Sequence, residues 1–475
     1  MKKRIIYVFL LTVVVVSSIV ACGETSTDGK SKDDATKHND LLPAGIEQKD
    51  YDSDFVVLAP EWGLYPNYFF SDEAGTDVMT KALYDRELTI EEHLGVRIKP
   101  RWVSTIGEIP VVIRENNMSG DNLYQLALTH CISGTSAMIT ENLLYDMNDL
   151  TAINFEADYY NHISNENLSV NGHQYYAISD FMIPDPNAVL FNKDMLEELQ
   201  LEAPYELVHH GEWTIDKMLE MMSAATLDEG DGKWDINDTY GFGAPDDWYL
   251  AAFLYSSGLK LVDKNEAGEF ELVFGKDERA YTMVDKLASL FNGPSTYVYN
   301  YMDTNVDNLL TIDKGRTLFG LETINKLNTL RDTDVEYGIL PYPMLDEDQE
   351  SYYSLDWSGL MCVPKTAQNS DMVGEVIELL AYYSDEEVLP TYYDLMLGEK
   401  LSRDPESKEM LDIIFDNIVF DAGMNYFGFS SNMNKLLFTG ARIASGVWPG
   451  LSSHLATYGP AAEFEILDFN EQIAQ

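Results

Sequence analysis

Short runs of hydrophobic residues recur along the chain at strand-like lengths. Residues 55–59 form a continuous apolar run, which is typical of a strand buried in a parallel sheet. Over 96–103 apolar positions alternate with basic ones, and 123–129 and 188–191 are again strand-like. These segments predict strands separated by stretches long enough to hold helices.

Two of the intervening segments carry clear helical patterns. Residues 77–94 have apolar side chains at roughly helical spacing, with Thr76 or Asp77 as the N-cap and Gly95 as the terminator. Ser370 is expected to cap a second helix, whose apolar residues recur at i, i+3, i+4 and i+7: Val373, Val376, Ile377 and Leu380. Strands that alternate with helices predict a parallel α/β sheet.

The first residues have the pattern of an export signal. Three basic residues at positions 2–4 precede the 16-residue apolar and small-residue run Ile5–Val20. Because a membrane-spanning helix needs about 20 apolar residues, we expect residues 1–21 to be a cleaved signal peptide. The stretch Ser18–Gly23 resembles a bacterial lipobox, in which Cys22 becomes the lipidated first residue. An ordinary cleaved secretory signal is the alternative.

Residues 22–51 follow with Ser, Thr, Asp, Lys and Gly and few large apolar side chains. Such a composition cannot bury enough surface to fold. We therefore expect a flexible tether between a lipid anchor on the extracellular face of the cell membrane and the folded part.

Charge narrows the possible partners. The chain has 31 Lys and Arg residues against 80 Asp and Glu residues, a formal net charge of −49. Because this charge repels phosphates and anionic lipids, nucleic-acid binding and polybasic membrane docking are poor interpretations, and the ligand should be neutral or cationic. With only three cysteines, no disulfide framework or four-ligand zinc cluster is expected.

Six stretches carry a family resemblance when taken in order. They are LYDMNDL at 144–150, NGHQYYAI at 171–178, VLFNKDML at 189–196, EWT at 212–214, GRTLFG at 315–320 and YGILPYP at 337–343. Together they resemble the extracellular solute-binding proteins of ABC importers, in the branch that includes maltose-binding protein. The resemblance covers essentially everything from Asp54 to the C-terminus.

The resemblance implies a two-lobe periplasmic-binding-protein-like fold of type II, each lobe a parallel or mixed sheet flanked by helices. The hinge would be crossed three times, near 179–185, 316–319 and 383–387. The N-terminal lobe would then comprise 52–180 and 319–384, and the C-terminal lobe 185–316 and 387–475. Such lobes close around a ligand in the cleft between them and present it to the transmembrane subunits of a permease.

Catalytic patterns do not accompany this resemblance. The sequence has no HExxH, GxSxG or P-loop motif and no convincing GxGxxG. His130 and Cys131 are neighbours, so in an extended segment their side chains would point to opposite faces, which disfavours a nucleophile–base pair. No catalytic residue and no enzyme activity are therefore predicted.

Aromatic residues beside hydrogen-bonding groups are the candidate ligand contacts. Trp62 and Tyr65 follow the first strand, where α/β sheets place ligand-contacting loops. A sugar suits this mixture because its C–H face packs on rings while its hydroxyls take directed hydrogen bonds. Core packing is the alternative for each ring. The candidates, of which Glu322 lies where the family resemblance implies ligand contact, are Trp62, Tyr65, Asp180, Asp247, Trp248, Tyr249, Glu322, Trp357 and Tyr426.

An acidic segment at 228–238 resembles the calcium loop of EF-hand or dockerin type. With Gly232 as the sixth position, the candidate ligands are Asp228, Glu229, Asp231, Asp235 and Asp238. The first position then falls on Leu227, so the set is incomplete, and a solvated acidic turn is the alternative. No cofactor other than structural calcium is predicted.

Together these observations predict a lipid-anchored, monomeric solute-binding component of an ABC importer that binds a mono- or oligosaccharide. A receptor for a peptide or another polar small molecule is the alternative within the fold. A sugar-binding surface protein that works without a transporter, and a secreted polysaccharide-degrading enzyme, are further alternatives.

Overall fold

The computed structural model describes residues 45–246, 248–300, 302–305, 309–357, 359–396 and 404–474. The expected signal peptide, Cys22 and most of the expected tether lie outside these ranges. Among the helices that are described, none combines the length and the apolar character needed to cross a bilayer.

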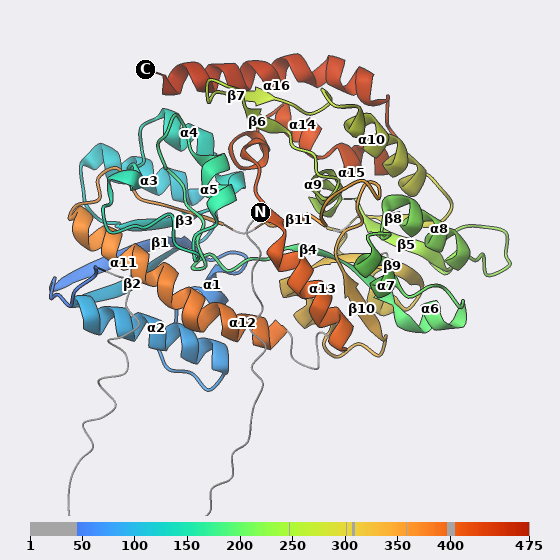
Figure 1. Ribbon diagram of the computed structural model, residues 1–475, viewed down its shortest axis with the longest axis horizontal. Coiled ribbons are helices and arrows are strands. Elements are labelled where there is room, and N and C mark those ends of the chain that lie inside the picture. The colour runs from blue at the N-terminus through green and yellow to red at the C-terminus, as the bar shows by residue number, and fades with distance from the viewer. Residues whose placement is uncertain are drawn as a thin grey trace, which may run out of the picture. The chain divides into compact units, whose positions relative to one another are not determined.

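The first sheet has the strand order β12-β3-β1-β2, and with its helices it forms the first lobe (Figure 1). The strands are β1 (Ser53–Pro60), β2 (Val96–Val103), β3 (Leu126–Thr129) and β12 (Leu360–Cys362). β1 is parallel to β2 and β3, with Ser53 opposite Val96, whereas β12 is antiparallel to β3. The strand predicted at 55–59 is confirmed, and its residues Phe55, Val57, Leu58 and Ala59 are completely buried.

The helices of the first lobe are α1 (Tyr65–Tyr68), α2 (Val78–Leu94), α3 (Glu108–Ser119), α4 (Thr135–Thr140), α5 (His162–Leu168), α11 (Ser370–Tyr383) and α12 (Leu389–Met396). Asp77 caps α2, because its carboxylate accepts a hydrogen bond from the Thr80 N–H. Gly95 ends the helix in the left-handed conformation at φ 63°, as predicted.

The second sheet has the order β10-β4-β9-β5-β8 and organises the second lobe. Its strands are β4 (Asn187–Asn192), β5 (Tyr240–Pro245), β8 (Thr296–Tyr299), β9 (Thr317–Thr323) and β10 (Tyr337–Leu340). β4 runs antiparallel to β9 and β10, whereas β5 is parallel to β8 and β9, so the sheet is mixed. Every residue of β4 is buried, which explains its nearly unbroken apolar sequence.

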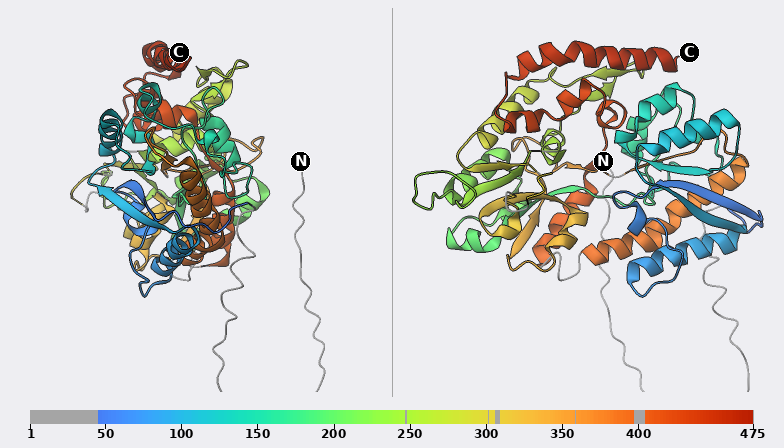
Figure 2. Two further views of the ribbon diagram at one scale, coloured as in Figure 1. Left: turned by 90° about the vertical axis from the view of Figure 1, so that its left-hand side faces the viewer. Right: turned by 180° about the vertical axis from the view of Figure 1, so that it is seen from behind.

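Helices and short strands complete the second lobe. The helices are α6 (Lys193–Glu198), α7 (Pro204–His210), α8 (Ile215–Ala225), α9 (Ala252–Ser256), α10 (Glu278–Phe291), α13 (Pro405–Asp416), α14 (Met433–Leu437), α15 (Thr439–Ala444) and α16 (Leu451–Ile473). The short strands are β6 (Val262–Lys264), β7 (Phe270–Leu272), β11 (Ser354–Leu355) and β13 (Ile418–Val419). α16 contacts both β7 and α4 and therefore touches both lobes, as the rear view in Figure 2 shows.

The chain passes between the lobes at three places. The first passage precedes β4, in the region expected at 179–185. The second was expected at 316–319, and this is wrong. β9 and β10 pair with β4 in the second sheet, so the return to the first lobe falls between Leu340 and Leu360.

The third passage also differs from the expectation at 383–387. α11, the π-helical turn η7 (Ser384–Val388) and α12 follow one another without a break, and all three contact α2. α13 instead packs on β10. The chain therefore leaves the first lobe after Met396, because η7 continues the helical stretch rather than ending it.

Candidate functional site

A cavity of about 650 Å³ is lined by both lobes, and its size suits a small-molecule ligand. From the first lobe and the passage segments it is lined by Trp62, Gly63, Leu64, Tyr65, Phe69, His130, Ile132, Ile183, Asp185, Trp357 and Gly359. From the second lobe it is lined by Trp248, Met302, Thr323, Asn325, Lys326, Phe429 and Phe438.

Most of the lining segments directly follow strands. The parallel strands β1 and β3 end at the same edge of the first sheet, and the segments after them carry Trp62 and His130. The parallel strands β5 and β9 likewise precede Trp248 and Asn325. The cavity therefore lies at the carboxyl ends of strands, where open α/β sheets bind ligands.

Tyr65 is fixed to the first-lobe wall by close packing. Its hydroxyl donates a 2.7 Å hydrogen bond to the Thr129 carbonyl. Gly359 faces this hydroxyl so closely that a Cβ at residue 359 would lie 1.6 Å from the Tyr65 oxygen. The ring is thus locked, and the position opposite it requires glycine.

His130 joins the first-lobe wall to the segment that carries Trp357. Its Nδ1 accepts from the Ile132 N–H, so Nε2 carries the proton and donates to the Trp357 carbonyl at 2.7 Å. Burial lowers the pKa of His130 to about 4, so the ring is neutral near pH 7. Trp62, which is 42% exposed, meets the His130 ring edge-on at 5.1 Å between centroids.

The expectation that His130 and Cys131 point to opposite faces is wrong. Cys131 begins the 3₁₀ turn η1 (Cys131–Ser133) rather than continuing the strand, and its Sγ lies 3.2 Å from His130 Nδ1. Burial raises the pKa of the thiol and lowers that of the imidazole. Both groups are therefore held neutral, which opposes formation of a reactive thiolate.

Aromatic rings from both sides form a continuous series along the cavity wall. Trp248 stacks on Tyr249 at 3.9 Å, and Trp357 meets Trp248 edge-on at 5.6 Å between centroids. Phe429 lies 6.3 Å from Trp357, and Phe438 lies 6.0 Å from Phe429. The Trp357 Nε1–H is buried and has no acceptor among the described residues.

The Lys326 ammonium group is held at one end of this aromatic series. The Lys326 ammonium donates to the Tyr249 hydroxyl at 3.0 Å, and this hydroxyl donates to Glu322 Oε2 at 2.9 Å. Burial raises the pKa of Glu322 to about 7, while the Tyr249 hydrogen bond opposes the rise. Glu322 and Tyr249 do not line the cavity themselves, but they orient Lys326, which does.

Asp185 lines the cavity where the first passage enters the second lobe. Its Oδ1 accepts from the Asn325 N–H at 2.8 Å, and its own N–H donates to Asp356 Oδ1 at 2.9 Å. Burial, with a contribution from the Asp356 carboxylate, raises the pKa of Asp185 to about 7. The carboxyl group is thus partly protonated near neutral pH.

The structure therefore brings Trp62, Tyr65, Trp248 and Trp357 to one cavity, with Tyr249 and Glu322 directly behind it. Asp247 lies outside the described residues. Two candidate residues, Asp180 and Tyr426, do not line the cavity. Asp180 is half-buried beside Asp385, and both desolvation and that carboxylate raise its pKa. Tyr426 is 4% exposed, stacks on Phe469 and donates to the Leu168 carbonyl, so it is a core residue.

Sequence reasoning missed several lining residues. Asn325 and Lys326 come immediately after β9, so the rule on strand carboxyl ends could have identified them. Phe429 and Phe438 lie in irregular segments beside short helices, and no periodic pattern distinguishes them from core residues.

The carboxylates of the acidic loop at 228–238 are engaged in hydrogen bonds within the loop. Asp228, Asp231 and Asp235 each accept a hydrogen bond from a backbone N–H two residues ahead, and the buried Asp238 accepts from Glu229 and Asp235. These local turns direct the carboxylates onto the loop's own backbone. Across the described part of the chain, no group of three or more His, Cys, Asp or Glu side chains is arranged to hold a metal.

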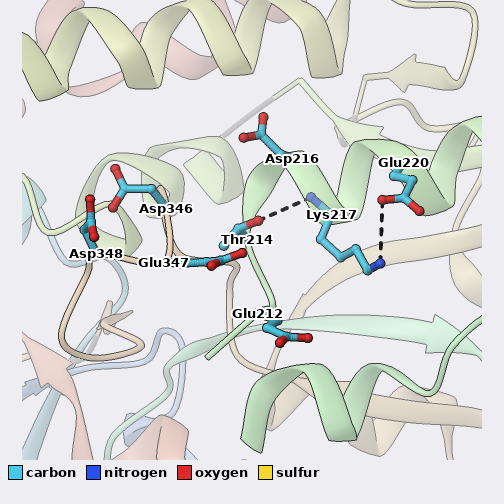
Figure 3. A pocket seen from close by; sticks show the side chains of 8 residues that line it. All are labelled: Glu212, Thr214, Asp216, Lys217, Glu220, Asp346, Glu347 and Asp348. Carbon is cyan, nitrogen blue, oxygen red and sulfur yellow. Dashed lines mark hydrogen bonds and ion pairs between the residues drawn. The ribbon is translucent and has the colours of Figure 1, made fainter. Parts of the chain in front are cut away.

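A second hollow, of about 520 Å³, lies on the second lobe (Figure 3). Its lining combines Thr214 and Lys217 with six acidic side chains: Glu212, Asp216, Glu220, Asp346, Glu347 and Asp348. Lys217 is paired with Glu202 and Glu220, so the lysine serves to offset local repulsion. No ring lines this hollow, and the cavity between the lobes remains the candidate site.

Comparison with known proteins gives no match to a protein-family model or to a curated protein sequence. Solved structures do match. The cyclic alpha-maltosyl-1,6-maltose binding protein from Arthrobacter globiformis is 12% identical, with a TM-score of 0.59 over 88% of this chain and 98% of that chain.

Two further structures match similarly. The galacto-N-biose-/lacto-N-biose I-binding protein of the ABC transporter from Bifidobacterium longum is 12% identical, with a TM-score of 0.57 over 89% of this chain and 98% of that chain. For the GacH receptor of Streptomyces glaucescens, solved with and without acarbose, the identity is 12% and the TM-score 0.56 over 88% and 98% of the two chains. These similarities confirm the predicted two-lobe fold class.

Proposed function

We propose that this protein is the solute-binding component of an ABC importer and that its cavity between the lobes binds a carbohydrate. The main support is the cavity itself, which combines aromatic rings with hydrogen-bonding groups at the carboxyl ends of strands from both lobes. The similar structures, named as sugar-binding proteins or receptors, support the same class of ligand.

In this proposal Trp62, Trp248 and Trp357 provide apolar ring surface to the ligand. Asn325 and Lys326 donate hydrogen bonds to its hydroxyls, and Asp185 accepts one. Closure of the lobes then buries the ligand, which is presented to the transmembrane subunits of the permease.

We further propose that the protein is a monomer held on the extracellular face of the membrane through a lipid on Cys22. The Ser18–Gly23 motif supports this anchor. A Cys22→Ser variant should be released from the membrane fraction. A variant that stays bound with unchanged processing would contradict the lipid anchor but leave the ligand proposal intact.

The ligand proposal is tested by a thermal-shift screen against sugars, peptides and other polar small molecules. A ligand at about 100 times its dissociation constant adds roughly 2.7 kcal/mol to the free energy of unfolding, so a true ligand should raise Tm clearly. A response to peptides alone would favour the alternative receptor.

Calorimetry then tests the rings. Trp62→Ala should weaken binding about 30-fold, because truncation of an interface hot spot costs about 2 kcal/mol. Trp234→Ala is a matched control, since Trp234 is similarly exposed at 48% and does not line the cavity. Equal affinities in the two variants would exclude Trp62 from the site.

A further inference from the structure

The cavity has chemically different ends. At one end, Asn325 and Lys326 follow β9 beside Asp185, with the Asn325 N–H on the Asp185 carboxylate. At the other end, Phe429 and Phe438 pack on each other in the segments around α14. A ligand that fills the cavity must present polar atoms to the first end and apolar atoms to the second.

The aromatic series connects these ends. The Lys326 ammonium lies 5.6 Å from the centre of the Trp248 ring, and Trp357 follows Trp248. Phe429 and then Phe438 continue the series away from the ammonium. Apolar surface therefore extends from the polar groups without interruption.

Ring orientation argues against a row of sugar platforms. Successive ring planes meet at 84° for Trp248 and Trp357, 70° for Trp357 and Phe429, and 74° for Phe429 and Phe438. Sugars stacked on successive residues would need ring faces that point the same way. Alternating faces and edges instead form a ridged apolar wall, against which an alkyl chain or an aryl ring packs well.

We infer that the preferred ligand is an amphipathic glycoside, a sugar that carries an alkyl or aryl aglycone. The sugar contacts Asp185, Asn325 and Lys326, and the aglycone lies along Trp357, Phe429 and Phe438. This inference rests on the proposed carbohydrate-binding function and specifies the class of carbohydrate.

Trp357 stands at the junction between the two parts, because its ring meets Trp248 on one side and Phe429 on the other.

The test is calorimetry with matched pairs of methyl and hexyl, and methyl and 4-nitrophenyl, glycosides of glucose, galactose and maltose. For the sugar that binds, the larger aglycone should tighten binding roughly 10-fold or more, since each buried CH₂ contributes about 0.8 kcal/mol. Phe429→Ala should remove most of this gain, so that the methyl and the larger glycosides bind with nearly equal affinity. Phe429 is 39% exposed, so the variant should fold.

Phe438→Leu provides a second variant of the same wall, and Phe464→Ala, on the exposed face of α16, is the control. Equal affinity for methyl and larger glycosides would overturn the inference while carbohydrate binding stands. Equal binding of hexanol or 4-nitrophenol alone would also overturn it. If no glycoside binds, the proposed function fails and the inference fails with it.

Discussion

Glu378 shows how this acidic protein holds a carboxylate inside its first lobe. The residue is 1% exposed on α11. Its two oxygens accept hydrogen bonds from the hydroxyls of Tyr159 and Tyr160, at 2.5 and 3.0 Å, and from the Asn154 N–H at 3.1 Å. Three neutral donors from one segment thus converge on a single side chain.

Glu378→Ala should lower the free energy of unfolding by about 3 kcal/mol, because it leaves three donors without their acceptor and opens a small cavity. Chemical denaturation measures this change. Asp371→Ala, at an exposed position on the first turn of the same helix, is the control and should cost less than about 1 kcal/mol. Similar losses for both variants would show that the hydrogen bonds contribute little.

At the scale of single elements, helix caps depend on backbone conformation as well as residue type. The sequence favours Ser370 as the cap of α11, but the structure uses Asn369 at φ 61°, whose side chain accepts from the Met372 N–H. Asparagine tolerates this left-handed conformation, and its carbonyl oxygen reaches the helix start. The periodicity located the helix but could not distinguish two adjacent polar residues.

The start of α2 provides a direct test, since Thr76 and Asp77 were both candidates for its cap. Asp77 Oδ1 accepts from the Thr80 N–H at 2.9 Å. Asp77→Ala should therefore lower the free energy of unfolding by about 1 kcal/mol in a denaturation experiment, and Asp77→Asn should cost less. Thr76→Ala should have almost no effect on the free energy of unfolding. A larger loss for Thr76→Ala than for Asp77→Ala would show that Thr76, and not Asp77, caps the helix.

The sequence predicts features that depend on neighbouring residues, but it does not predict those that depend on pairing between distant segments. The β1 strand, the α2 helix and the ring positions at Trp62 and Trp248 follow from runs of residues that lie close in sequence. The second passage does not, because the placement of β9 depends on its antiparallel pairing with β4, more than a hundred residues earlier. Phe429 reaches the cavity for the same reason, through tertiary packing that no local pattern encodes.

For the whole molecule, carboxyl groups whose pKa is raised in the folded state, among them Asp185, Glu322 and Glu87, link stability to pH. Burial raises the pKa of Asp185, Glu322 and Glu87 to about 7 in the folded protein. Between about pH 4 and 7 the folded state therefore binds more protons than the unfolded state. The stability that these protonated carboxyl groups contribute is fully present below their unfolded pKa values and is lost as pH rises through about 7.

Tm should consequently fall between pH 5.5 and pH 8, as measured by calorimetric scans in low salt. Asp185→Asn and Glu322→Gln should each make the decline shallower, because neither amide titrates. Glu141→Gln is the control, since Arg114 lowers the pKa of Glu141 and its titration lies below this window. A wild-type Tm that rises over the same interval would contradict the assignment.

The burial of Cys131 and Cys362 has a kinetic consequence. Both are free, and burial raises the pKa of each thiol, so alkylating reagents meet almost no thiolate while the fold is intact. Cys131 adjoins the cavity wall, whereas Cys362 lies in β12 within the first sheet. Their separate alkylation rates would therefore time two different events, local opening beside the cavity and disruption of the sheet, without any added label.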